Sequence, residues 1–195
     1  GVPIRECFRQ FERELADLAV IMGKRVKPIA YTGNNPRVLA QPMQPLLLSM
    51  IHMCRNIVDH GIEPVVTRLA RGKEPAGQVT IHTDLLPGAG KTMLQIRISD
   101  DGNGIDPAAV RARLEKIDPG GAWKQENDQA VIQRILMWDV STKNEVTDLS
   151  GRGVGMEAVE REVKLLGGTV EVQSDLYRGA SFDIRIPYNL DAPKA

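Results

Sequence analysis

The sequence predicts an α/β protein, a two-layer sandwich in which helices cover one face of a mixed, mostly antiparallel sheet. Apolar and polar residues alternate in two pairs of segments joined by short turns, within 78–100 and 169–188. This pattern is typical of antiparallel strands with one buried face. Three other segments repeat apolar residues every three or four positions, which indicates amphipathic helices. Both kinds of element bury one side, so they pack as two layers.

The first half of the chain predicts two long helices and an edge strand. The first helix covers 3–22 and ends at Gly23, since glycine favours a helix C-terminus. A short strand follows at 25–31, and Pro28 within it favours an edge of the sheet. The second helix runs over 42–61. The first pair of alternating strands comes next.

The second half predicts further helices around a long irregular region. A helix over 106–117 begins with Asp106 as its cap. Residues 117–130 are polar and glycine-rich and predict a loop, and 128–138 predict a short helix. The irregular region as a whole covers roughly 117–150. Irregular regions of this length are often lids, so we expect a lid at about 106–150. A helix over 156–168 precedes the closing hairpin.

Length and composition limit the classes of function. The 195 residues suit one domain, expected at 1–189, with a tail or linker at 190–195. There are 25 Lys and Arg against 25 Asp and Glu, with 4% aromatic residues. This balance excludes the basic surface of a nucleic-acid-binding protein. No apolar run is long enough for a membrane span, and no signal peptide is present.

The cysteines and the first residue complete this picture. Cys7 and Cys54 lie in apolar helical patterns and are expected to be buried thiols, since no metal-ligand spacing is present. Because the chain starts at Gly1 without methionine, we expect it to be part of a longer protein.

Three glycine clusters are candidates for phosphate binding, and the first, "PGAGKT", is not a P-loop. That motif requires a glycine at position 85, where this chain has Leu85, and a helix after the threonine. The residues after Thr92 alternate as a strand instead. The cluster therefore predicts a hairpin turn in which Gly88 and Gly90 adopt positive φ.

The third cluster, "SGRGVGM", lies just before a predicted helix. Gly151, Gly153 and Gly155 would let a ligand approach the backbone, and the helix N-terminus offers free N–H groups to phosphate. The residues before it are polar and irregular, whereas a dinucleotide-binding fold requires a strand there.

The second cluster, "SDDGNGID", places Asp100 at the end of an apolar strand, followed by Gly102 and Gly104. A carboxylate beside bare backbone can accept hydrogen bonds from an amino group such as that of adenine. The alternative is a simple turn after a strand.

The second helix carries His52, Asn56 and His60 at steps of four, opposite its apolar face. An Asn carbonyl can ligate Mg²⁺, and histidine can orient water, take a proton or donate to phosphate. A solvated polar stripe is the alternative. Together with Asp100 and the third glycine cluster, the stripe predicts a three-part nucleotide site.

These motifs resemble the ATP-binding domain, with its Bergerat-type fold, of histidine kinases, gyrase-type topoisomerases, heat-shock-90 chaperones and mismatch-repair ATPases. The resemblance is greatest to the catalytic domain of the chemotaxis histidine kinase CheA family. "HMCRNIVDHGIE" is similar to its N-box, "DDGNGID" to its first glycine box and "STKNEVTDLSGRGVGM" to its second with the approach to it. The likeness covers nearly all of the chain.

The resemblance implies a role for each motif residue. Asn56 would bind Mg²⁺, His52 would stand where related ATPases carry a glutamate base, and His60 would reach towards the phosphates. Asp100 would accept from the adenine amino group. The residues implied to line the base pocket or the phosphates are Gly102, Gly104, Ser141, Thr142, Lys143, Gly151, Arg152, Gly153, Val154 and Gly155.

The resemblance also implies the reaction and the partners. ATP and Mg²⁺ would supply a γ-phosphoryl group to a histidine on a separate phosphotransfer domain, for relay to a response regulator. Receptor-coupling proteins are further expected partners. The isolated domain is expected to be monomeric and cytoplasmic, the parent protein dimeric, with no nucleic acid and no membrane insertion.

Two departures from the family pattern keep alternatives open. Trp138, Asp139 and Val140 replace a Pro-Gly-Phe in the lid, and Ala180 replaces a threonine beside the adenine. A weakened, nucleotide-sensing regulatory module is therefore one alternative. An ATP hydrolase of gyrase or chaperone type is another, although His52 in place of glutamate disfavours water activation.

Overall fold

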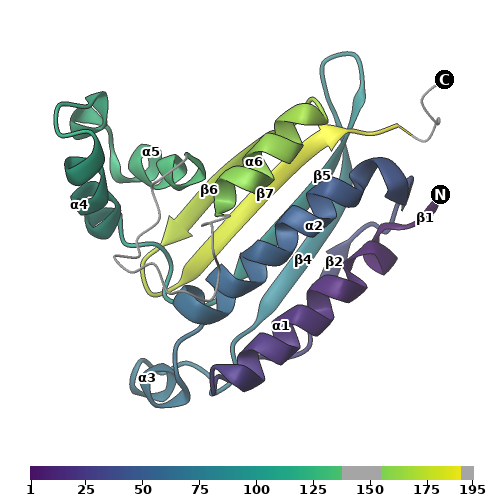
Figure 1. Cartoon of the computed structure of the whole chain (residues 1–195). Helices are drawn as coiled ribbons and strands as arrows, with labels where there is room; N and C mark the ends of the chain where they lie inside the picture. The colour runs from purple at the N-terminus through teal and green to yellow at the C-terminus, as the bar shows by residue number, and fades with distance from the viewer. Residues whose placement is uncertain (138–154, 190–195) are drawn as a thin grey trace.

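The computed structural model describes residues 1–137 and 155–189 and confirms the two-layer α/β architecture (Figure 1). The main sheet has the strand order β2-β4-β5-β7-β6. These strands are β2 (Ala30–Gly33), β4 (Val79–Pro87), β5 (Thr92–Asp100), β6 (Thr169–Asp175) and β7 (Gly179–Pro187). Only β2 and β4 pair in parallel, and the other neighbours are antiparallel.

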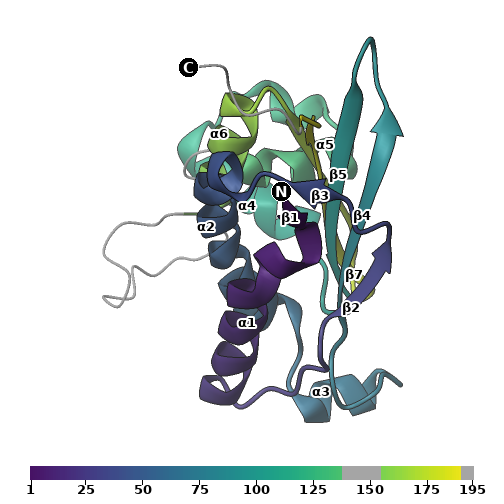
Figure 2. The same ribbon diagram turned by 90° about the vertical axis from the view of Figure 1, so that its right-hand side faces the viewer.

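Helices cover one face of this sheet and leave the other open (Figure 2). The helices are α1 (Arg9–Ile21), α2 (Ala40–Asn56), α3 (Val65–Ala70), α4 (Pro107–Ile117), α5 (Asp128–Gln133) and α6 (Met156–Leu165). Short elements are β1 (Val2–Pro3), β3 (Arg37–Val38), and the turns η1 (Ile4–Phe8), η2 (Ile57–Gly61), η3 (Ala122–Gln125) and η4 (Arg134–Leu136). The helices α1, α2 and α6 form the covering layer, while α4 and α5 lie beyond the edge strand β6.

The core lies between the alternating residues of the central strands and this helix layer. Ile96 and Ile98 of β5, with Phe182 and Ile184 of β7, are buried against the helices. The next residues along the same strands face the open side, where Asp183 accepts hydrogen bonds from Gln95 and Arg97. Period-two alternation thus predicted both faces correctly.

The predicted hairpin is formed by β4 and β5, which pair over their full length. Gly90 has the expected positive φ of 74°, but Gly88 does not, so that prediction was wrong for Gly88. A side chain at Gly88 would instead meet Met93 and the carbonyl of Lys91. Because β5 begins at Thr92, no helix is available to complete a P-loop.

Three element predictions need correction. The edge strand starts at Ala30, after Pro28, and Val26 makes only an isolated bridge to Gly77. The 117–130 segment is not all loop, because η3 lies within it and α5 starts at Asp128. Helix α3 was not predicted, since its six residues are too short to show a period.

The other helix predictions hold, with changes at their ends. Gly23, with φ of 65°, ends the first helix, and Asp106 caps α4 by accepting from the N–H of Ala108. Cys54 is buried as expected, whereas Cys7 is only half-buried. None of the helices in the described residues has the length and apolar content that crossing a bilayer requires.

Candidate nucleotide-binding site

Asp100 ends the central strand β5 with its carboxylate largely buried against the glycine turn that follows. Its Oδ1 accepts the N–H of Gly102 at 2.8 Å. Burial raises the pKa of Asp100 to about 6, helped by the charges of Asp101 and Glu63, while the N–H groups of Gly102 and Ala180 lower it. The group is therefore an anion at neutral pH that retains further acceptor sites for a ligand.

Glycine is required where the backbone closes around this carboxylate. A β-carbon on Gly102 would lie 2.1 Å from the carbonyl oxygen of Gly61, and one on Gly179 would lie 1.9 Å from the carbonyl oxygen of Asp100. A β-carbon on Gly104, which has φ of 69°, would lie 2.5 Å from the carbonyl oxygen of Asp175. The second glycine cluster, which follows β5, thus lets three chain segments meet beside the carboxylate of Asp100.

A pocket of about 480 Å³ opens beside Asp100, a volume that suits a small-molecule ligand. It lies where β5 ends, β7 begins and β6 ends, with α5 beside it. The lining residues are Ser99, Asp100, Gln129, Gln173, Ser174, Asp175, Gly179, Ala180 and Ser181. Ala180 faces this pocket without a hydroxyl group, as the departure from the family pattern implied.

Sequence reasoning missed Gln129 and Ser174 as pocket residues. Gln129 is one polar residue among many in a segment without a motif, and no signal marks it. Ser174 lies opposite Ala180 in the β6–β7 hairpin, so the register of that hairpin could have identified it. Its hydroxyl accepts the N–H of Ile105 at 2.7 Å and joins this hairpin to the glycine turn.

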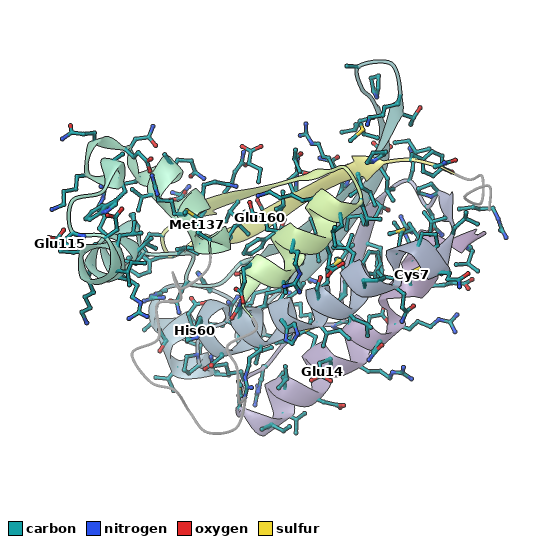
Figure 3. The ribbon with its side chains drawn as sticks, turned by 45° about the horizontal axis from the view of Figure 1, so that its top comes forward. Cys7, Glu14, His60, Glu115, Met137 and Glu160 are labelled. Atoms are coloured by element: carbon teal, nitrogen blue, oxygen red, sulfur yellow. The ribbon has the colours of Figure 1, made fainter. Side chains whose placement is uncertain are left out.

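The His-Asn-His stripe lies on α2 and the turn that follows it, but the residues between Asn56 and His60 do not form a regular α-helix. Helix α2 ends at Asn56, and the π-helical turn η2 follows, closed by the N–H of Ile62 on the carbonyl of Ile57 at 2.6 Å. His52 and His60 are exposed and Asn56 is half-buried. Figure 3 shows His60 at the end of α2.

The end of this helix is joined directly to the glycine turn. Asn103 donates its side-chain N–H to the carbonyl of His60 at 3.2 Å and its backbone N–H to that of Gly61 at 2.7 Å. A β-carbon on Gly61 would lie 3.4 Å from Oδ1 of Asp100. The structure therefore places the backbone at the end of the stripe beside Asp100, whereas no residue of the stripe is among those that line the pocket.

The residues near the stripe fit a hydrated cation better than a fully protein-bound metal. No group of three His, Cys, Asp or Glu side chains in the described residues could hold a metal ion. Asn56 offers one amide oxygen, which is sufficient for Mg²⁺ that keeps waters and takes its other ligands from phosphates.

Gly155 is the described glycine of the third cluster, and it precedes α6, which packs against α2. Its N–H donates to Oε1 of Glu157 at 2.8 Å, so a carboxylate already uses the positive end of this helix. The other implied phosphate residues lie outside the described residues: Ser141, Thr142, Lys143, Gly151, Arg152, Gly153 and Val154. The departures at Trp138, Asp139 and Val140 and the tail at 190–195 lie outside them too.

Comparison with known protein families gives one match over most of the chain. The model of the histidine kinase-, DNA gyrase B- and HSP90-like ATPases matches residues 47–190, which include both described parts of the site.

Curated relatives match almost the whole chain. The chemotaxis protein CheA of Borreliella burgdorferi is 35% identical over 97% of the chain and 21% of the relative. CheA of Rhizobium meliloti is 33% identical over 96% of the chain and 24% of the relative. The gliding motility regulatory protein of Myxococcus xanthus is 34% identical over 97% of the chain and 24% of the relative. The chain thus spans about a fifth to a quarter of the length of these relatives.

Solved structures share the fold at lower identity. Full-length ShkA in complex with AMPPNP has a TM-score of 0.60 at 21% identity, over 99% of this chain and 32% of that one. The blue-light activated histidine kinase EL346 of Erythrobacter litoralis has a TM-score of 0.51 at 16% identity, over 91% of this chain and 40% of that one. These likenesses confirm the architecture of the sheet and its covering helices.

Proposed function

Because this chain belongs to the family of histidine kinase-, DNA gyrase B- and HSP90-like ATPases, as a CheA-like histidine kinase ATP-binding domain, we propose that it catalyses phosphoryl transfer to a histidine on a separate domain. The observation that carries this proposal is the carboxylate of Asp100, which lines a pocket at the end of β5 and is backed by the glycine turn that follows it. Such a carboxylate accepts a hydrogen bond from the amino group of adenine and rejects a base with a carbonyl in that place.

The described residues support a division of labour within the site. Asp100 holds the adenine, and the phosphates would have to displace Glu157 from the N–H of Gly155 to reach the N-terminus of α6. Asn56 of α2 would hold Mg²⁺, which neutralises the phosphate charges when it is bound. His52 and His60 lie along the same helix side, where they can orient water or donate to phosphate.

Phosphoryl transfer requires positioning and charge neutralisation more than acid–base chemistry. A nitrogen of the acceptor imidazole forms a bond to the γ-phosphorus, and the bond from phosphorus to the β–γ bridging oxygen breaks. The phosphohistidine and ADP are the products. The acceptor histidine belongs to a phosphotransfer domain, which passes the group to a response regulator.

The setting of this reaction is part of the same proposal. The isolated chain would act as a cytoplasmic monomer, and the parent protein as a dimer with receptor-coupling partners. A second candidate function is a regulatory module that binds nucleotide weakly, favoured by Ala180, which leaves the pocket without a hydroxyl group at that position.

Calorimetric titration with ATP, with and without Mg²⁺, tests the binding step. We expect binding that strengthens with Mg²⁺ and is lost in Asp100→Ala. The control is Asp84→Ala. Asp84 is a carboxylate on β4 of the same sheet that accepts a hydrogen bond from Asn34, and it does not line the pocket. Equal binding by both variants would contradict the assignment of Asp100.

A transfer assay with a histidine phosphotransfer domain and labelled ATP tests the reaction. We expect acid-labile phosphohistidine with the unaltered chain and none with Asn56→Ala. The control is Asn34→Ala, whose side chain donates to Asp84. Binding without transfer to any supplied domain would favour the regulatory module, and rapid phosphate release without an acceptor would favour a hydrolase.

A further inference from the structure

A cluster of charges with a buried Glu–Arg pair at its centre contacts the glycine turn after Asp100. It consists of Glu63, Arg68, Lys73 and Asp101, and we name it the α3 cluster. Glu63 and Arg68 are 1% and 0% exposed, respectively. They come from α3 and the chain before it, the part of the fold that sequence periodicity did not predict (Figure 1).

Arg68 is the centre of the α3 cluster and makes three kinds of contact. Its Nη1 lies 3.1 Å from Oε1 of Glu63, and its Nη2 lies 2.9 Å from Oδ2 of Asp101. Its Nε donates to the carbonyl of Glu74 at 2.7 Å. The guanidinium therefore ties α3 to the residue that directly follows Asp100.

Lys73 holds the backbone of the glycine turn itself. Its Nζ donates to the carbonyls of Asp101 and Gly102 at 2.8 and 2.9 Å and lies 2.8 Å from Oε2 of Glu63. Hydrogen bonds from a charged donor are about twice as strong as neutral ones. Both carbonyls that follow Asp100 are thereby fixed by one ammonium group.

Arg71 extends this support to the second wall of the pocket. Its Nη1 donates to Oδ1 of Asn103, and its guanidinium lies 4.3 Å from the centre of the Tyr177 ring. Tyr177, at the turn between β6 and β7, has φ of 67°, a strained conformation for a residue with a side chain. Its N–H donates to the carbonyl of Asn103. One short segment thus holds both loops that meet at Asp100.

Buried ion pairs are weak evidence for stability, because desolvation opposes their attraction. A fully buried Glu–Arg pair that contacts a ligand-binding turn therefore suggests a role in fixing geometry. We infer that Arg68 and Lys73 are positioning residues for nucleotide recognition, which hold the backbone of Asp101 and Gly102 so that the Asp100 carboxylate faces the pocket. For its effect on ATP this inference rests on the proposed function.

The α3 cluster also balances charge around Asp100. Asp101 on the same turn and Glu63 after α2 raise the pKa of Asp100, and the cations Arg68 and Lys73 lie against both of them. The neighbours from β7 and η2, Gly179 and Gly61, carry no charge, and the charged residue that β6 adds to the same pocket is Asp175. Loss of a cation from the α3 cluster should therefore move the titration of Asp100 to higher pH.

The test compares Lys73→Met with Lys27→Met in the full chain. Lys27 pairs with Glu74 at the surface and does not contact the glycine turn, so it is a matched control. We expect Lys73→Met to weaken ATP binding about tenfold, as for one or two charged hydrogen bonds, and Lys27→Met to stay within about twofold. Carboxyl-carbon NMR should show Asp100 titrating at higher pH in Lys73→Met alone.

The titration separates positioning from a general loss of stability, which would not move the midpoint of Asp100 in the folded protein. Unchanged ATP affinity and an unchanged midpoint in Lys73→Met overturn the inference. If that variant does not fold, Lys73→Gln takes its place with Lys27→Gln as its control, and equal ATP affinity of these two variants overturns the inference. If the unaltered chain binds no ATP, the proposed function fails, and the Asp100 midpoint alone decides the inference.

Discussion

The carboxylate of Asp100 is charged in surroundings that disfavour charge. Burial is the largest influence and raises its pKa to about 6, and two backbone N–H groups offset this only in part. A group that served structure alone would be more stable as a neutral side chain of the same shape. The cost is consistent with a residue whose free acceptor sites are kept for a ligand.

Asp100→Asn should therefore stabilise the fold at neutral pH. The folded-state pKa lies above the ordinary value, so the cost of the charge is absent below about pH 4, grows through pH 6 and is complete above it. Asn can still accept the N–H of Gly102. We expect the free energy of unfolding at pH 7.5 to rise by about 1–3 kcal/mol, measured by urea denaturation.

The exposed Asp17→Asn serves as the control and should change this free energy little. At pH 4 the two variants should differ from the unaltered chain by similar small amounts. A loss of stability in Asp100→Asn at pH 7.5 would show that the carboxylate stabilises the glycine turn, contrary to our reasoning.

The same titration should control nucleotide affinity. Protonation places a hydrogen on the carboxyl group and weakens it as an acceptor for the adenine amino group, so ATP affinity should fall by up to tenfold for each pH unit below 6. Titrations with ATP between pH 5 and pH 8 would measure this. Since phosphate groups titrate nearby, tripolyphosphate, which has no base, is the control ligand. An equal decline for both ligands would remove Asp100 from the explanation.

At the scale of elements, predictability followed the length and periodicity of each segment. Helix α1 and strands β4 to β7 repeat their apolar residues over many positions, and the sequence placed them correctly. Helix α3 has six residues, and the side chain it buries most deeply is that of Arg68, so neither length nor polarity marked it. The π-helical turn η2 leaves no sequence pattern either.

Helix α5, a short helix that the sequence did predict, is held in place by side-chain contacts that the sequence did not reveal. Gln133 donates to the carbonyl of Val170 at 3.0 Å and accepts the N–H of Val172 at 2.7 Å, and Gln129 donates to the carbonyl of Val172. Strand β6 is an edge of the sheet. The two glutamines satisfy backbone groups that an edge strand would otherwise expose.

Gln133→Leu should weaken this edge. The carbonyl of Val170 and the N–H of Val172 would lose their hydrogen-bond partners, while α5 still covers them. We therefore expect the free energy of unfolding to fall by about 1–3 kcal/mol. Urea denaturation measures the total, and hydrogen exchange at the Val172 amide measures the local effect. Gln173→Leu, exposed on the same strand, is the control. Equal effects of both variants would mean that solvent replaces the lost contacts.

At the scale of the molecule, the motifs assign residues to one nucleotide site, which stays a prediction, but they do not predict how the walls of the pocket are built. Asn56, Asp100 and Gly155 come from α2, β5 and the start of α6, and the order of the motifs was enough to assign them to one nucleotide site. The walls depend on the register of β6 and β7, on α5 and on α3. These are tertiary contacts between segments without motifs, so local sequence patterns could not reveal them.

A ligand that joins these segments should stabilise the whole chain and not only the pocket. Binding to the folded state alone adds about 2.7 kcal/mol at a hundred times the dissociation constant. For a chain of this size that corresponds to a rise in Tm of about 5–10 °C. We expect Mg·ATP to produce this rise in the unaltered chain, measured by calorimetry or near-ultraviolet circular dichroism.

The variant Asp100→Asn tests this prediction, because it should change the stability of the fold and ATP binding in opposite directions. The variant should melt at a higher temperature than the unaltered chain without nucleotide, and it should gain nothing from Mg·ATP. A rise of equal size in both proteins would mean that the ligand stabilises the fold through the phosphates alone. A lower Tm of the variant without nucleotide would instead mean that the buried carboxylate holds β5, η2 and β7 together.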